Sequence, residues 1–258
     1  MGEWQLALDE CQKALALEGV ELMDLKSFQG REKERYVLDN KNPEIVFTQG
    51  YSATNTFYDQ MSYFCICTFG GSEDLISLYN RFEEQQIKDL RLDAFFEVIG
   101  DEQYKMSKVG EKVYDCFVIR SAELYLNKAE AEAMLDKAEA IQTIKTLLHN
   151  RFEGGIPDVD GLSGKDLVSF IRDERRRELC FEAHRWFDLR RYAVSPKYPE
   201  KKSIRHTAYD IKGKLEGDYV LKPYGEDPAW VLPIPGYEIV YNQGNLVDNP
   251  QRVDRELE

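Results

Sequence analysis

The sequence predicts a mostly α-helical fold with minor short β-strands and long irregular loops. Apolar residues recur at helical spacing in two long stretches, residues 120–151 and 167–192. Clusters of glycine and proline between and after these stretches interrupt regular structure. With 258 residues the chain is long enough to bury a substantial core, and we expect a single domain over 1–258.

The first predicted element is a helix from Trp4 to Glu18, which ends before Gly19. Segment 2–18 resembles the second helix of a tetratricopeptide (TPR) repeat. In such repeats small residues let neighbouring helices approach closely, so that a repeat buries its face against another repeat. The residues that carry this resemblance are Gly2, Trp4, Ala7, Ala14 and Leu15.

Shorter elements are predicted between residues 20 and 98. Residues 20–36 are expected to be irregular, and Glu44–Phe47 follows the Asn42-Pro43 turn as a short strand. Ser72 precedes two acidic residues and starts a helix through Asn80. Residues 88–98 are expected to form a short extended or helical element.

A helical hairpin is predicted over residues 120–151. Its first helix covers 120–134 and its second 136–151, with Asp136 as the expected N-cap of the second helix. The small-residue stripe of the first helix again resembles a TPR helix, and it consists of Ala122, Leu126, Ala129 and Ala133.

Glycine and proline divide the rest of the chain. Gly154, Gly155, Pro157 and Gly161 separate the hairpin from a third helix, for which Ser163 is the expected N-cap. Residues 193–228 are expected to form a long excursion with a β-hairpin around Gly213 or Gly217. The Pro-Ile-Pro segment at 233–235 excludes regular helix there.

The third helix combines an apolar stripe with dense charge. Glu174, Glu178 and Glu182 share or border this stripe, and an unpaired buried carboxylate would cost several kcal/mol. We therefore predict a structural ion-pair lattice rather than an active site. The stripe consists of Leu167, Phe170, Ile171, Leu179, Ala183, Trp186 and Leu189, so Trp186 is expected in the core. The expected partner cations are Arg175, Arg176, Arg177, Arg190 and Arg191.

The same stretch carries the pattern E-R-R-x-E-L-x-x-E-x-x-R-W-x-D-L-x-R. It resembles the C-terminal signature of the SusD/RagB family, which are glycan-binding outer-membrane lipoproteins of Bacteroidetes. The matching residues are Glu174, Arg175, Glu178, Leu179, Glu182, Arg185, Trp186, Asp188, Leu189 and Arg191. The resemblance implies that this motif holds the helical framework together and does not touch sugar. Ala183 or His184 stands where family members usually carry glycine.

Four further segments resemble family motifs in the expected order. They are Glu44–Phe47, the Lys88–Leu92 element, the helix from Arg120 to Ala131, and residues 230–250 with their Pro-Ile-Pro sequence. The resemblance implies a SusD-like α fold, an oligosaccharide or polysaccharide ligand and a cell-surface lipoprotein in the outer membrane. It also implies delivery of the ligand to a SusC-like TonB-dependent transporter.

Family members are usually about twice as long and begin with a lipoprotein signal peptide and a large N-terminal helical half. This chain opens inside a helical repeat, without a signal peptide or a lipid-anchor cysteine. We therefore expect it to be the C-terminal part of the family fold, with the N-terminal portion absent.

Residues 51–64 are the richest candidate for sugar contact. Sugars bind mainly through aromatic rings packed on their C–H faces and through amides and charged groups that bond the hydroxyls. The segment alternates such residues in what the sequence predicts to be a loop, where binding residues concentrate. Tyr51, Asn55 and Tyr58 are the predicted ligand contacts, and the resemblance implies that this loop contributes to the glycan platform.

Composition excludes several classes of function. A net charge of −13 argues against nucleic acid, whose phosphates require a basic face. No run approaches the ~18 apolar residues that a transmembrane helix needs. With three histidines and no C-x-x-C pair, we predict no metal site and no cofactor. The five cysteines indicate no disulfide framework.

We predict that the protein is not an enzyme. A glycosidase needs a carboxylic acid with a raised pKa, whereas the clustered glutamates lie among arginines that would lower theirs. The P-loop, the Gly-x-Ser-x-Gly elbow and the His-Glu-x-x-His motif are all missing from the sequence.

The alternative is a TPR-type protein-interaction scaffold without its own sugar site. It rests on segments 2–18 and 120–151. Contiguous repeats would recur about every 34 residues. These two segments instead lie roughly a hundred residues apart, as in the interrupted repeats of SusD-like proteins.

Overall fold

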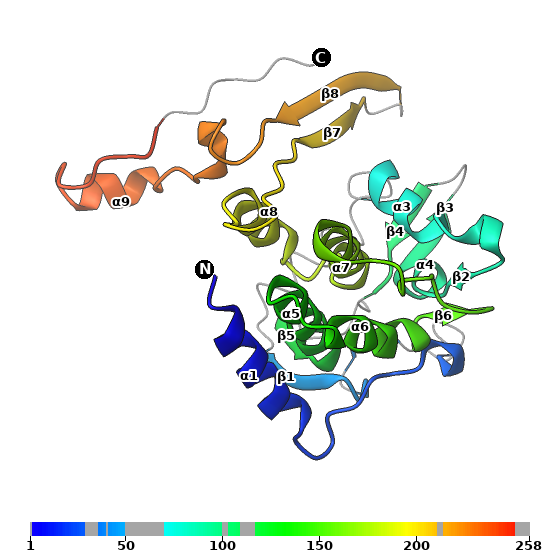
Figure 1. The fold of residues 1–258 in the computed structure, drawn as a ribbon. Coiled ribbons are helices and arrows are strands. Elements are labelled where there is room, and N and C mark those ends of the chain that lie inside the picture. The colour runs from blue at the N-terminus through cyan, green and yellow to red at the C-terminus, as the bar shows by residue number, and fades with distance from the viewer. Residues whose placement is uncertain are drawn as a thin grey trace. The chain divides into compact units, whose positions relative to one another are not determined.

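The computed structural model describes residues 2–28, 36–39, 41–49, 70–99, 103–108, 117–210 and 214–250 (Figure 1). The chain divides into two compact units, Gly2–Arg185 and Trp186–Glu258. The mostly helical fold class is confirmed, and the described strands pair only in twos.

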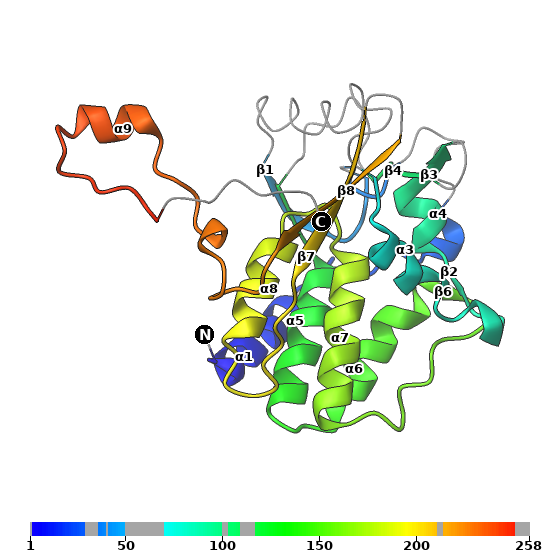
Figure 2. The same cartoon turned by 90° about the horizontal axis from the view of Figure 1, so that it is seen from above.

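The first unit is built on α5 (Ser121–Met134), which packs against α1 (Trp4–Leu15), α6 (Glu139–His149) and α7 (Gly164–Glu178) (Figure 2). The predicted small-residue stripe of α5 lies at these contacts: Ala122, Leu126, Ala129 and Ala133 are all buried. Small side chains allow three helices to approach one central helix closely, which is the packing that the TPR resemblance implied.

Shorter helices and three antiparallel strand pairs complete this unit. The helices are α3 (Glu73–Asn80), α4 (Arg91–Phe95) and the 3-10 helices Leu25–Ser27 and Glu83–Gln85. The strand pairs are β1 (Ile45–Gln49) with β5 (Phe117–Arg120), β2 (Lys88–Asp89) with β6 (Phe152–Glu153), and β3 (Phe96–Ile99) with β4 (Gln103–Met106). The pairs β1–β5 and β2–β6 join segments that are far apart in the sequence.

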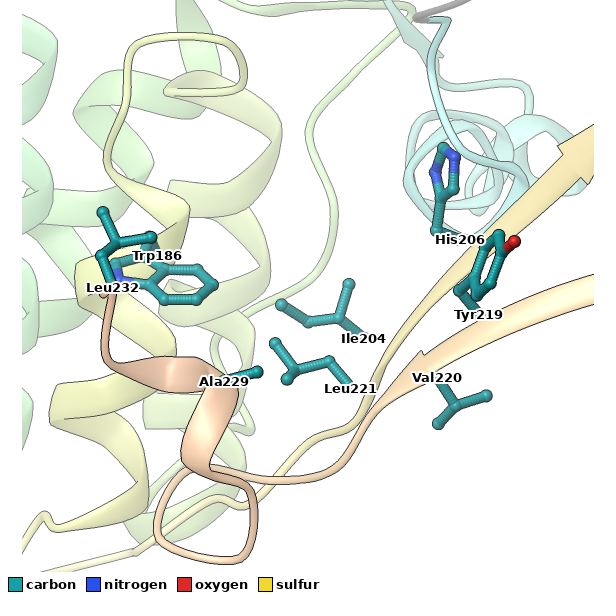
Figure 3. A pocket seen from close by; sticks show the side chains of 8 residues that line it. All are labelled: Trp186, Ile204, His206, Tyr219, Val220, Leu221, Ala229 and Leu232. Atoms are coloured by element: carbon teal, nitrogen blue, oxygen red, sulfur yellow. The ribbon is translucent and has the colours of Figure 1, made fainter. Parts of the chain in front are cut away.

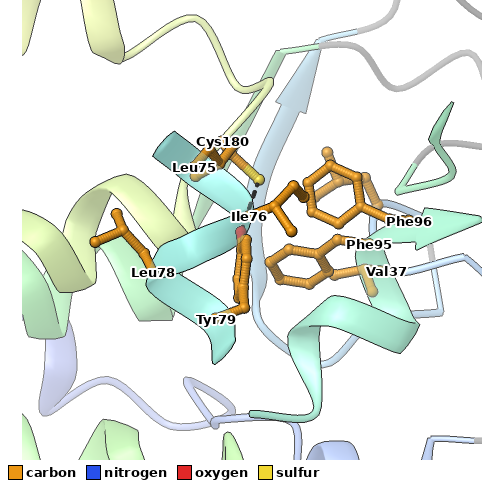
Figure 4. Packing of buried hydrophobic residues seen from close by; sticks show 9 residues of the cluster. Val37, Leu75, Ile76, Leu78, Tyr79, Phe95, Phe96 and Cys180 are labelled. Carbon is orange, nitrogen blue, oxygen red and sulfur yellow. Dashed lines mark hydrogen bonds between the residues drawn. The ribbon is translucent and has the colours of Figure 1, made fainter. Parts of the chain in front are cut away.

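An aromatic cluster holds α3 and the strand β3 against the end of α7 (Figure 4). The Tyr79 hydroxyl donates to the Arg177 carbonyl at 2.7 Å and lies 3.3 Å from the Cys180 thiol. The Phe96 ring meets Tyr79 edge-on, with 5.7 Å between ring centroids. The buried cluster consists of Val37, Leu38, Leu75, Ile76, Leu78, Tyr79, Phe95, Phe96 and Cys180. Cys180, like Cys11, is therefore a core thiol and forms no disulfide.

In the second unit, α8 (Arg185–Ala193) leads to the hairpin of β7 (Ile204–Tyr209) and β8 (Leu215–Leu221), a 3-10 helix (Pro228–Trp230) and α9 (Gly236–Tyr241). Trp230 anchors the unit: the residue is 2% exposed and its Nε1 donates to the Lys222 carbonyl at 2.7 Å. The Asp227 carboxylate accepts from the Ala229 amide at 2.9 Å and so caps the 3-10 helix.

Most of the predicted elements are confirmed, including the helix from Trp4, the strand at 45–47, the helix through Asn80 and the hairpin at 121–149. The predicted N-cap Asp136 is wrong. It has a φ of 56° in the turn after α5, and Ala138 precedes α6 instead. The β-hairpin turns between Tyr209 and Leu215, so Gly217 lies inside β8, whereas Gly213 falls outside the described residues.

The prediction of one continuous signature helix is also wrong. α7 ends at Glu178 and α8 begins at Arg185. Between them Phe181 and Ala183 take φ values of 61° and 63°, in the left-handed region that ends helices. The apolar stripe of the sequence therefore crosses the turn between the two helices. The sequence did not reveal this break, because the spacing of three or four residues between apolar positions is kept across it.

Candidate functional site

The densest charged site of the first unit centres on the Glu178 carboxylate at the end of α7. It accepts from Arg120 Nη1 at 2.6 Å, from Arg91 Nη1 at 3.0 Å, and from Arg151 Nε and Nη2 at 2.9 and 3.1 Å. None of these four side chains is more than 1% exposed. Both oxygens of one carboxylate are thus saturated by three guanidinium groups.

Further buried carboxylates and cations extend this cluster into a closed ion-pair lattice. Glu44 bridges Arg120 and Arg151 at 2.8 and 2.5 Å. Glu182 accepts from Arg120 Nε at 2.9 Å and from Lys108. Among the residues that the structure describes, its five carboxylates are Glu44, Asp89, Glu174, Glu178 and Glu182, and its five cations are Arg91, Lys108, Arg120, Arg151 and Arg177. These described groups balance one another in charge, which offsets the cost of burying them.

The lattice keeps its central glutamates ionised. Burial acts to raise the pKa of Glu178, but Arg151, Arg120 and Arg91 outweigh it and hold that pKa well below 4.5. Burial opposed by Arg120 and Lys108 leaves the pKa of Glu182 at about 2. The pKa of Glu174 is likewise lowered, since Arg177 and Arg91 outweigh burial. None of these three carboxyls is suited to donate a proton near neutral pH.

A pocket of about 360 Å³ lies within the second unit (Figure 3). Its lining residues are Trp186, Ile204, His206, Tyr219, Val220, Leu221, Ala229 and Leu232. Trp186 stacks on the buried Trp230 with 4.4 Å between ring centroids. The expectation that Trp186 is a core residue is therefore wrong: it is half-buried and forms one wall of the pocket.

The predicted ligand contacts Tyr51, Asn55 and Tyr58 lie outside the residues that the structure describes. Within the described ranges, no group of three or more His, Cys, Asp or Glu side chains is placed to hold a metal ion. The helices of this part of the chain are also too short or too polar to cross a membrane.

Most of the charged lattice and most of the second unit fall within residues 91–251, which match the model of the SusD family, whereas Glu44 and Asp89 lie before this range. The chain belongs to the SusD family. Two SusD-like proteins of Formosa agariphila are similar to it, with 35% identity over 113 residues and 27% over 147. These matches cover 40% and 51% of this chain but only 21% and 25% of the relatives.

Solved structures of the SusD family share the fold. A SusD superfamily protein of Bacteroides thetaiotaomicron aligns with a TM-score of 0.69 over 97% of this chain and 57% of its own, at 20% identity. Surface glycan-binding protein A of Bacteroides uniformis aligns with a TM-score of 0.56 over 96% of this chain and 56% of its own, at 17% identity. The chain thus spans little more than half the length of these solved proteins.

The SusD signature residues divide between two places. Glu174, Glu178 and Glu182 belong to the lattice of the first unit. Arg175 instead donates to Asn127 on α5 at 2.7 Å. The signature residues Arg185, Trp186, Asp188, Leu189 and Arg191 lie on α8, where the buried Asp188 pairs with Arg191 at 2.8 Å.

The predicted lattice is confirmed, but most of the expected partners are wrong. Of the five nearby arginines expected to pair with the glutamates, only Arg177 belongs to the lattice. The others come from distant segments: Arg91, Arg120 and Arg151 lie 87, 58 and 27 residues from Glu178. Four of the missed members, Glu44, Asp89, Arg91 and Arg120, lie inside the other SusD-like motifs, and this position was the signal that could have identified them. Nothing in the sequence around Lys108 pointed to it.

Proposed function

We propose that this chain is the C-terminal part of a non-catalytic glycan-binding protein of the bacterial cell surface. The observation that carries the proposal is the SusD family match over residues 91–251. The solved protein of similar fold that is named a surface glycan-binding protein supports it. In the same proposal the protein is an outer-membrane lipoprotein that hands its oligosaccharide to a SusC-like TonB-dependent transporter, and the two units act as one SusD-like domain.

The described structure supports a binding role more than a catalytic one. The buried glutamates of the signature are saturated by arginine and lysine, and their pKa values are lowered. A glycosidase requires the opposite arrangement, with one carboxyl kept protonated beside the scissile bond. Burial of both partners indicates that the lattice supports the fold, because its groups have no access to a ligand.

The proposed sugar contacts are Tyr51, Asn55 and Tyr58. Isothermal titration or affinity electrophoresis against starch, mucin, plant and host glycans tests them. The wild-type chain is compared with Tyr51→Ala and Tyr58→Ala, and with Tyr241→Ala as the control, since Tyr241 is an exposed tyrosine of α9. We expect saturable binding of one glycan, weakened by about fivefold or more in at least one loop variant, because a stacked ring supplies about 1 kcal/mol or more.

The opposite result would be that the chain binds no glycan although its cooperative unfolding shows that it is folded. It would remove the sugar site from these residues and favour the second candidate, a TPR-type interaction scaffold. The packing of α1 and α6 on the small-residue face of α5 is the observation that favours this scaffold.

A further inference from the structure

The pocket of the second unit has a floor that is set by the register of its hairpin. Ile204 pairs with Leu221 across the two strands, and His206 pairs with Tyr219. Alternate residues of a strand face the same side, so these two pairs lie on one face of the hairpin. The floor therefore changes along its length from a purely aliphatic pair to a pair that carries an imidazole and a phenol (Figure 3).

The indole ring of Trp186 forms the end of the pocket beside the aliphatic pair, and a second tryptophan supports it on its other side. Trp186 stacks on Trp230 at a centroid distance of 4.4 Å and an interplanar angle of 35°. Trp230 is itself fixed by its hydrogen bond to the Lys222 carbonyl and by the edge of Tyr224, at 5.9 Å. A side chain fixed in this way loses little conformational entropy when a ligand packs on it.

The chemistry of the lining indicates what kind of group fits. The eight lining residues include no Asp, Glu, Asn, Gln, Lys or Arg, so the pocket offers no partner to a charged group and few partners to a ring of sugar hydroxyls. His206 and Tyr219 supply hydrogen-bonding atoms at one end, and at the other end the indole N–H of Trp186 can only donate. A volume of about 360 Å³ lies at the lower end of the range for small-ligand pockets.

We propose that this pocket binds an uncharged aryl group, such as the aromatic acyl ester of a substituted glycan. The ring packs between Trp186 and the Ile204–Leu221 pair, and its ester or phenol oxygen faces His206 and Tyr219. That the aryl group is attached to a glycan rests on the proposed function. The binding of an aryl group by the pocket does not rest on it, because a free aryl ester can test that binding.

Titration of the whole chain with methyl ferulate, an uncharged aryl ester, tests the pocket, with Trp fluorescence and calorimetry as readouts. We expect saturable binding that Tyr219→Ala and Trp186→Ala each weaken by about tenfold. Tyr241→Ala, an exposed aromatic of the same unit outside the pocket, should leave the affinity unchanged. Methyl 3-cyclohexylpropanoate, which lacks the aromatic ring, should bind more weakly than methyl ferulate.

Two results would overturn the proposal: no saturable binding of methyl ferulate by the folded chain, or an affinity that neither pocket variant changes. If Trp186→Ala unfolds, Tyr219→Ala decides, because Tyr219 is partly exposed on the hairpin. The glycan titrations with Tyr51→Ala and Tyr58→Ala are an independent experiment. If the chain binds a glycan but no aryl ester, the proposed function stands and the aryl pocket is rejected. If it binds the aryl ester but no glycan, the aryl pocket stands and the proposed function is rejected.

Discussion

Ala183 occupies a backbone conformation that alanine rarely adopts. Its φ of 63° lies in the left-handed region, where a Cβ atom meets the neighbouring carbonyl, and its side chain is exposed. SusD-like sequences usually carry glycine at this point or at the next residue. A glycine, which has no Cβ, would take this φ without strain, whereas this chain makes the turn with a residue that is strained there.

Ala183→Gly should stabilise the first unit. Removing the Cβ relieves about 1–2 kcal/mol of left-handed strain, and the added freedom of the unfolded chain offsets about half of it. We expect a gain of about 0.5–1 kcal/mol in the free energy of unfolding, measured with urea. Ala16→Gly is the control, because Ala16 is exposed with an ordinary φ of −86° and should show no gain. A loss of stability in Ala183→Gly would refute the strain.

At the scale of elements, one buried lysine ties the end of α7 to the turn that follows it. Lys108 Nζ donates to the carbonyls of Glu178 and Cys180 at 2.6 and 3.2 Å and to the Glu182 carboxylate. The same ammonium lies 4.1 Å from the centre of the Phe95 ring. Carbonyls at a helix end lack partners within the helix, so this cation satisfies groups that α7 leaves open.

Lys108→Met should loosen this turn. The methionine keeps the stem but leaves Glu182 and two buried carbonyls with fewer donors, which costs about 3 kcal/mol. We expect amide hydrogen exchange over residues 179–184 to accelerate more than exchange in α5. Lys105→Met on β4 is the matched control and should leave exchange unchanged. Equal acceleration in the turn and in α5 would contradict a local role for Lys108.

For the molecule as a whole, the lattice makes stability depend on pH. Glu174, Glu178 and Glu182 have folded-state pKa values below their ordinary value of 4.5. A carboxyl whose pKa is lowered on folding stabilises the protein above its unfolded pKa, and this stability is lost as pH falls through the folded pKa. Burial raises the pKa of Asp89 despite Arg91, so Asp89 acts in the opposite direction and offsets part of the loss.

Urea unfolding between pH 7 and pH 3 should show this dependence. We expect little change above about pH 5 and a steep loss of stability below about pH 4.5, as the pKa of Glu182 is about 2 in the folded protein. Glu182→Gln, which cannot titrate, should be less stable at pH 7 and lose less on acidification. Glu10→Gln, on the exposed surface of α1, should follow the wild-type profile. A flat profile down to pH 3 would show that folding does not lower the pKa values of the lattice glutamates.

How far the sequence could predict the structure depends on the range of the interaction. The helices and their small-residue stripe were predictable because helical periodicity depends on residues that lie three or four positions apart, such as Ala122, Leu126 and Ala129. The break at Phe181 and Ala183 was not, because left-handed alanine and phenylalanine contradict local preference and depend on tertiary support. The half-buried position of Trp186 was missed for the same reason, since it lies on α8 beyond that break.

The sequence by itself determined the family, the mostly helical fold class and the need to pair the buried glutamates. Only the tertiary structure decided which cations pair with them. Arg91, Arg120 and Arg151 reach Glu178 from three separate segments, and Lys108 reaches Glu182 from a fourth. The physical reason is that burial requires a charge to be neutralised in space, while the distance along the chain places no limit on where the partner comes from.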